Sequence, residues 1–293
     1  MASSMFSALW MLAATGCFTF MALVIKLLSD RFGVGDLLFL RLACSALWVL
    51  LFQQVIGFNL RTRATGLHLR RAACGCVAMA AWYHTLGTLP MGISVTLNYM
   101  SPLFLGALLH LTRAQDAAPT RKQICMLGLG FAGVVLMMNP FETGLEAAHL
   151  SAYGVGIMGA MFGAMAFRDV KVLKAAGETE WQMVFYFSLL GAALSLPFTQ
   201  LQHLPEIGNR TDVWLMLLAG LLGAIGQLCV SKAFTQGDPM VPAAIQYTSV
   251  VFSALLGWLV FQELMDFHRL AGMTLVVVAA VSATALGIKK LPR

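Results

Sequence analysis

Two short stretches of this chain combine a side-chain amide, a tyrosine and a serine in the same order. The first is 98–101, Asn-Tyr-Met-Ser, and the second is 246–249, Gln-Tyr-Thr-Ser, with one constant offset between matching positions. Amides and hydroxyls donate and accept hydrogen bonds, and a tyrosine ring can stack on a planar group. The alternative is that these side chains only hold neighbouring helices together. We predict a site for a small polar ligand, formed by Asn98, Tyr99, Ser101, Gln246, Tyr247 and Ser249.

Two cationic side chains are related by the same offset. His84 and Lys232 each lie toward the end of an apolar segment, where they could meet a carboxylate or phosphate of a ligand. A lysine near a membrane interface can equally extend its ammonium group into water, and a histidine there can also face water. Trp82, Tyr83 and Gln227 could add to the same site, although aromatic residues are also common at membrane interfaces.

The long apolar segments that hold these residues assign the chain to a membrane. Hydrophobic residues make up 59% of the 293 residues, charged residues only 11%, and the mean hydropathy is +0.80. A soluble domain has about a quarter charged residues. The apolar runs are continuous and near helix length, which argues against β-barrel strands. We expect an all-α integral membrane protein with ten transmembrane helices, at about 5–28, 37–58, 72–89, 91–111, 123–139, 150–167, 183–201, 213–234, 240–261 and 270–288.

Ten spans divide into two halves of five, 1–146 and 147–293, and the matched stretches fall in the fourth span of each half. Because five is an odd number, the second half must enter the membrane from the opposite side, which is the inverted repeat of a secondary transporter. Most of the 19 Lys and Arg residues fall in loops on one side. The positive-inside rule makes that side cytoplasmic, so we expect a multi-pass protein of the cytoplasmic (inner) membrane with both termini in the cytoplasm.

Charge and cysteine placement argue against other classes of function. The net charge of +6 follows the predicted topology, so nucleic acid is not an expected partner. No second cysteine pair and no nearby histidine completes a metal site around Cys74 and Cys76, and we expect no metal and no cofactor. The stretch 33–36, Gly-Val-Gly-Asp, matches a motif of intramembrane aspartyl proteases, but the second intramembrane aspartate is missing. We therefore do not expect an enzyme.

Three further features concern how the helices move and pack. Pro102 lies inside a span and predicts a bend beside the first of the two stretches. Gly220, Gly223 and Gly226 predict close helix contact, either as static packing or as a sliding surface. The acidic residues lie in loops or near predicted helix ends, whereas carriers coupled to H⁺ or Na⁺ commonly hold a carboxylate deep in the membrane. This favours a facilitator or exchanger, with His84 as the alternative for proton coupling.

Several motifs resemble the EamA-type branch of the drug/metabolite transporter superfamily. The first half has Ser-Pro-Leu-Phe at 101–104 and the second has Gly-Asp-Pro at 237–239, and Arg41 and Arg121 also match the family pattern. The resemblance covers both halves and implies a ten-helix carrier with a central cavity, lined mostly by its helices 1, 3, 4, 6, 8 and 9. It also implies alternating access. One departure is Gln115, which stands where the family usually has the glutamate that Glu263 provides in the second half.

The expected function is therefore secondary transport of a small organic metabolite, such as an amino acid, a vitamin or a nucleoside-like compound, that is zwitterionic or anionic. The expected partners are that small-molecule substrate and the lipid bilayer, and the sequence leaves a homodimer open. A non-transporting membrane scaffold or receptor is the alternative. The two differ in whether Asn98, Tyr99, Gln246 and Tyr247 face one common cavity.

Overall fold

The computed structural model describes residues 2–28, 31–89, 91–112, 119–139, 150–200, 210–236, 238–261 and 266–290. Every regular element within these ranges is helical, which confirms the all-α prediction. The predicted boundary between the halves, at 146 and 147, lies outside the described residues, as do Gln115 and Glu263. The helices are α1 (Ala2–Leu28), α2 (Val34–Ile56), α3 (Thr65–Thr88), α4 (Met91–Asn98), α5 (Ser101–Leu111), α6 (Arg121–Met138), α7 (Leu150–Ala175), α8 (Glu180–Ser195), the 3₁₀ helix η2 (Leu196–Phe198), α9 (Arg210–Thr235), α10 (Met240–Ile245), α11 (Thr248–Phe261) and α12 (Phe267–Lys290).

Eight segments of the described chain are long and apolar enough to cross a membrane, and 240–256 is a shorter apolar segment. One of the eight, 93–111, runs through both α4 and α5. The helix α3 is not among them, and it carries Arg70 and Arg71 in its first two turns. The multiple apolar helices agree with the sequence analysis, whereas ten crossings stay a prediction.

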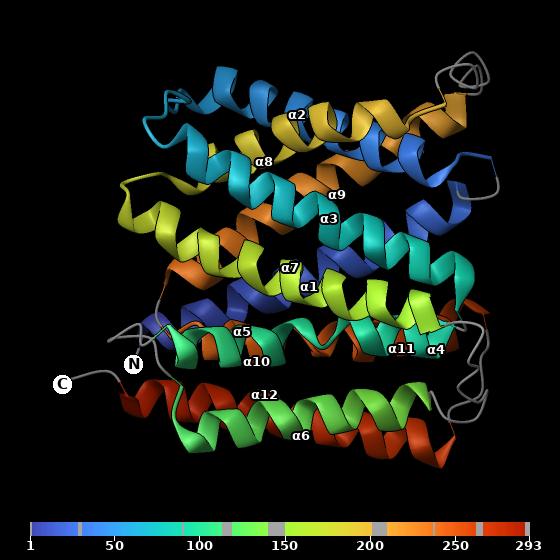
Figure 1. Cartoon of the computed structure of the whole chain (residues 1–293), viewed down its shortest axis with the longest axis vertical. Helices are drawn as coiled ribbons and strands as arrows, with labels where there is room; N and C mark the ends of the chain where they lie inside the picture. The colour runs from blue at the N-terminus through green and yellow to red at the C-terminus, as the bar shows by residue number, and fades with distance from the viewer. Residues whose placement is uncertain are drawn as a thin grey trace.

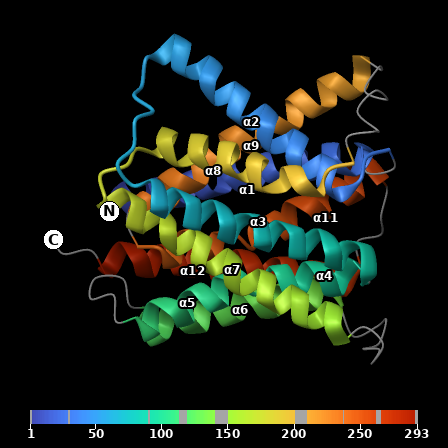
Figure 2. The same ribbon diagram turned by 45° about the horizontal axis from the view of Figure 1, so that its top comes forward.

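The helices form one bundle in which neighbours in space are mostly distant in sequence. The helix α1 packs along α9, α3 along α7, and α6 along α12, while α2 and α8 pack against each other and against α9 (Figure 1). Figure 2 shows α2 crossing α9. The start of α1 and the end of α12 lie at the same end of the bundle (Figure 1). We call this the terminal end and the other the distal end.

Glycines on α9 allow the crossing with α2 to be very close. A Cβ added at Gly220 would lie 2.3 Å from Cys44 Cβ on α2, while one at Gly226 would lie 2.7 Å from the Phe18 ring on α1, so α9 packs closely against both helices. Ser45 Oγ donates to the carbonyl oxygen of Gly220 at 2.7 Å across the contact with α2. The predicted small face of this helix is therefore a site of direct backbone packing.

The helix α7 extends about two turns beyond the apolar span predicted at 150–167. The extension contains Asp169, which the apolar pattern placed near the end of a helix but which is buried within this one. Its carboxylate accepts hydrogen bonds from Arg70 Nε at 2.8 Å and Nη2 at 2.5 Å. Hydropathy does not predict that this charged turn is helical and buried, because the partner of Asp169 is a residue of another helix.

Candidate functional site

The two matched stretches are both helix breaks. The first separates α4 from α5 and the second separates α10 from α11. Pro102 has no N–H to donate to the carbonyl oxygen of Asn98, four residues before it. Ser101 Oγ donates to that oxygen instead, at 2.8 Å, and Ser249 Oγ donates to the carbonyl oxygen of Gln246 at 2.9 Å. The predicted bend at Pro102 is therefore present, and both breaks have the same serine contact.

The second break forms without a proline inside it. The backbone N–H groups of Tyr247 and Ser249 bond to carbonyl oxygens three residues back, at 3.4 and 3.2 Å. Such tight turns replace the ordinary helical bond to the fourth residue back. The signal that the two stretches share is a serine three residues after the amide, because this hydroxyl can compete for the backbone carbonyl.

The two breaks touch each other through tyrosine. The hydroxyl of Tyr99 is hydrogen-bonded to Ser249 Oγ, and the rings of Tyr99 and Tyr247 lie 6.2 Å apart between centroids, tilted by 59°. Tyr247 is fully buried and packs against Gly130 of α6, where an added Cβ would lie 2.6 Å from the ring. Its hydroxyl has no hydrogen-bond partner among the described residues. The two tyrosines, although matched in sequence, are thus in unlike environments.

The described hollow that Asn98 lines does not include Gln246, and a cavity common to the two amides stays a prediction. Gln246 is partly buried, and its Oε1 has no partner among the described residues. Asn98 lines a small hollow between α3, α4 and α7, into which Trp82 also projects; the Nε1 donor of Trp82 is unpaired in the described structure. The residues of this hollow are Ala78, Trp82, Thr85, Asn98, Gly156, Gly159 and Ala160.

The predicted cationic pair is not brought together. His84 is exposed, whereas Lys232 holds its Nζ 4.2 Å from the centroid of the Trp10 ring on α1. Tyr83 is buried in an apolar cluster between α2, α3 and α8 that includes Leu42, and its ring lies 5.4 Å from that of Trp82. The aromatic pair next to His84 is thus inside the bundle although His84 is not.

Two buried arginines were missed as site candidates. Arg71 donates to the carbonyl oxygen of Met183 at 2.6 Å and to Gln227 Oε1 at 3.3 Å, which gives the predicted residue Gln227 a partner. Arg41 lies between α2, α3 and α9. Arg71 lies at the basic edge of an apolar segment, where the sequence assigns it to a loop. Arg41 is an isolated basic residue within another apolar segment. Only the structure shows that both point inward.

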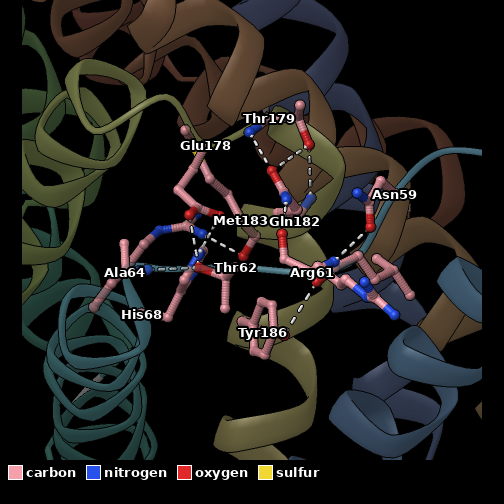
Figure 3. A network of polar contacts seen from close by, with 12 residues as sticks. Asn59, Arg61, Thr62, Ala64, His68, Glu178, Thr179, Gln182, Met183 and Tyr186 are labelled. Atoms are coloured by element: carbon pink, nitrogen blue, oxygen red, sulfur yellow. Dashed lines mark hydrogen bonds and ion pairs between the residues drawn. The ribbon is translucent and has the colours of Figure 1, made fainter.

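A polar network at the terminal end joins the loop before α3 to the loop before α8 (Figure 3). Glu178 accepts from Thr62 Oγ1 at 2.6 Å and pairs with His68 Nε2 at 2.9 Å, while Gln182 Nε2 donates to the carbonyl oxygen of Arg61 at 2.5 Å. Gln182 also completes a capping box with Thr179 at the start of α8. These contacts tie the first half of the chain to the second.

The same network shifts the pKa values of its two titratable members, Glu178 and His68. Both residues lie outside the predicted apolar spans. Burial opposes ionisation of Glu178, but hydrogen bonds from Thr62 and His68 outweigh it and hold the pKa of this carboxyl below its usual value. Burial lowers the pKa of His68, against the opposing effect of Glu178. Both shifts favour an ionised glutamate and a neutral histidine near neutral pH.

Other contacts join the helices at the distal end. Arg31 Nη1 lies 2.6 Å from both carboxylate oxygens of Asp212 at the start of α9, and Asp36 accepts from the backbone N–H of Gln200 at 2.8 Å. A Cβ at Gly35 would overlap the carbonyl oxygen of Phe198, at 1.9 Å. The described ion pairs therefore lie toward the ends of the bundle, and its middle holds amides, hydroxyls, rings and arginines.

The model of the EamA-like transporter family matches residues 5–139 and again residues 150–285. The chain is 26% identical to the pseudopaline exporter of Pseudomonas aeruginosa over 276 residues, covering 93% of this chain and 94% of that protein. It is also 26% identical to a riboflavin transporter of Vibrio cholerae over 293 residues, covering 97% and 94%. An S-adenosylmethionine uptake transporter of Rickettsia bellii is 22% identical over 260 residues, covering 87% and 85%.

A solved structure described as "Crystal structure of protein" has the same fold. Its TM-score is 0.80 at 15% sequence identity, and the superposition covers 97% of this chain and 98% of that one. At this identity the match concerns the fold alone.

Proposed function

The chain belongs to the EamA-like transporter family, and from this premise we propose that it is a secondary transporter that moves a small zwitterionic or anionic metabolite by alternating access. It is a multi-pass membrane protein, and its named relatives are transporters and not enzymes. What the proposal adds is the class of substrate, the location of the site and the mechanism.

The proposed topology is two inverted five-helix repeats with both termini on the cytoplasmic side of the inner membrane. The helices make ten crossings if α4 with α5, and α10 with α11, each cross once. The family model matches the chain twice, which supports its division into two halves. The start of α1 and the end of α12 lie at the same end of the bundle, which supports an even number of crossings. The terminal end is then the cytoplasmic end. A homodimer stays a prediction.

The observation that carries the proposed site is the meeting of the two helix breaks. Interrupted helices inside a membrane are tolerated where the backbone is buried in protein or lines a cavity, and transporters bind substrates at such breaks. Tyr99 and Ser249 join the breaks here, while the side-chain amide oxygen of Gln246 and the Trp82 indole N–H keep unused hydrogen-bonding capacity. A polar ligand between α4–α5 and α10–α11 would satisfy these groups when the helices separate.

Alternating access requires that one end opens while the other stays closed. The terminal end is held by the Glu178 network and by the stacked rings of Phe167 and Phe234, 5.1 Å apart between centroids. The distal end is held by Arg31 and Asp212. With both ends tied, the conformation corresponds to a closed state between the inward-open and outward-open ones.

Uptake into proteoliposomes tests this function directly. The panel includes radiolabelled amino acids, riboflavin and S-adenosylmethionine, because relatives carry the last two, and each is measured with and without a pH gradient. The test variant combines Asn98→Ala with Gln246→Ala. The matched control is Gln53→Ala, an amide on α2 that bonds to the carbonyl oxygen of Phe58 at 3.4 Å, away from the breaks.

Saturable uptake that the double variant loses and the control keeps would support a carrier with its site between the two breaks. Uptake that survives in the double variant would move the site elsewhere. No uptake of any compound by folded protein would favour the scaffold or receptor alternative.

A further inference from the structure

Arg41 is a buried cation that the described structure leaves almost unbonded. It is 2% exposed, and its only described hydrogen-bond partner is the sulfur of Met79 on α3, 3.4 Å from Nη1. Its Nε has no partner in the part of the chain that is described. A guanidinium has five N–H donors and a thioether is a weak acceptor, so most of the hydrogen-bonding capacity of this group is unused.

Arg71 shows how the same bundle satisfies a buried arginine. It is 3% exposed and donates to the Met183 carbonyl oxygen and to the side chains of Gln227 and Ser231. Its guanidinium carbon also lies 5.0 Å from the centroid of the Phe187 ring, a cation–π contact. The fold therefore supplies acceptors to Arg71 that it does not supply to Arg41.

The groups around Arg41 do not neutralise its charge. Its guanidinium lies against the backbone of Gly223, where an added Cβ would be 3.1 Å from Nε. Two titratable side chains lie close enough to act on its charge, Tyr83 and Cys76, and a phenol and a thiol are both neutral near pH 7 in their ordinary state. Ser45, one turn along α2, gives its proton to the Gly220 carbonyl oxygen. None of the described ion pairs includes Arg41.

We propose that Arg41 binds the oxyanion of the transported metabolite, a carboxylate or a phosphate, at a subsite between α2, α3 and α9 that is separate from the two helix breaks. This inference rests on the proposed transport function and names the group of the substrate that is recognised. A buried unpaired charge is costly, and proteins keep one where a partner repays that cost. The planar fork of a guanidinium matches the two oxygens of a carboxylate or phosphate. Arg41 lies roughly 10 Å from the start of α2 at 1.5 Å per residue, well inside the bundle.

The test is thermal unfolding of the purified full chain, because it does not require transport. The unfolding temperature is measured in sodium chloride, sodium acetate and sodium phosphate at equal ionic strength, for the wild type, Arg41→Met and Arg71→Met. Acetate probes a carboxylate site and phosphate a phosphate site. Comparing variants in each salt removes the general effect of that salt on protein stability.

The wild type is expected to gain about 2–4 °C in acetate or phosphate at roughly ten times the dissociation constant. Arg41→Met should lose this gain and unfold at a higher temperature than wild type in chloride, because an unpaired buried charge has been removed. Arg71→Met should unfold at a lower temperature but keep the gain.

Three results would overturn the proposal: no gain in the wild type with either anion, a gain that persists in Arg41→Met, or a lower unfolding temperature of Arg41→Met in chloride, including failure to fold. Failure of the transport function is a separate outcome. In that case acetate or phosphate raises the unfolding temperature in a way that depends on Arg41, but the protein transports none of the tested compounds.

Discussion

Removing a single hydroxyl should have opposite effects at Tyr99 and Tyr247. Ser249 Oγ donates to the carbonyl oxygen of Gln246, so the Tyr99 hydroxyl must donate to Ser249 in the contact that joins the two breaks. Tyr99→Phe removes that bond. Tyr247→Phe removes a hydroxyl that is fully buried and has no described partner. The two substitutions are chemically identical and lie at matched positions.

The magnitudes follow from these two environments. A lost hydrogen bond between neutral groups costs about 0.5–1.5 kcal/mol, and Tyr99→Phe leaves the proton of Ser249 still bonded to Gln246. Burying an unbonded hydroxyl costs about 1–3 kcal/mol in protein mutational data, and Tyr247→Phe recovers that cost. The free energies of unfolding of the two variants should therefore differ by about 1.5–4.5 kcal/mol, with Tyr247→Phe the more stable.

Denaturant titration of the detergent-solubilised protein measures this difference. Tyr186→Phe is the control, because its hydroxyl donates to the carbonyl oxygen of Leu60 at 3.1 Å outside the two breaks. It should lose about 0.5–1.5 kcal/mol, as Tyr99→Phe does. A Tyr247→Phe variant that is destabilised by as much as Tyr99→Phe would refute the reasoning, since it would mean that the Tyr247 hydroxyl has a partner of equal strength.

Two more predictions concern the terminal end and the crossing of α2 with α9. The pKa values of Glu178 and His68 are both lowered in the folded protein. Their contribution to stability is therefore complete above the ordinary histidine pKa of about 6.5 and is lost as the pH falls through their folded pKa values. The unfolding temperature should drop below pH ~6.5, and this drop should be less steep in His68→Gln. An unchanged slope in this variant would contradict the role of the network. Gly220→Ala should lower the unfolding free energy by about 1–3 kcal/mol, because its Cβ would lie 2.3 Å from Cys44 Cβ, while Gly154→Ala, with nothing within 4 Å, should raise it by about 0.5–1 kcal/mol. Equal effects of the two alanines in chemical denaturation would argue against the close crossing.

The helical fold was predictable because membrane helices can be recognised in a sequence by their length and hydropathy. The exceptions have a common cause. The helix α3 begins with basic residues and α7 continues past its apolar span through Asp169, and both extensions are stabilised by the ion pair between Arg70 and Asp169. Hydropathy averages over a single segment, so it does not detect a charge that is neutralised by a residue far away in the chain.

The position of the candidate site stays a prediction, whereas the local structure of its residues can be compared with the sequence. The repeated stretches coincide with both helix breaks, but the sequence predicted only the first, from Pro102; the second has no proline inside it and was expected to lie in a continuous span. The unlike environments of Tyr99 and Tyr247 were not predictable, since the two tyrosines occupy matched positions in sequence but pack against different helices. Arg41 was noted only as a family residue, and its lack of an acidic partner is a property of three helices together.

The unpaired charge of Arg41 has an electrical consequence. A charge inside the membrane lies in the transmembrane field, where moving one elementary charge across the full potential is worth about 2.3 kcal/mol per 100 mV. A bound monoanionic metabolite would cancel that charge, so the carrier loaded with it would reorient as a neutral pair while the empty carrier returned with its positive charge. Membrane voltage would then act on the return of the empty carrier and leave the loaded step nearly unaffected.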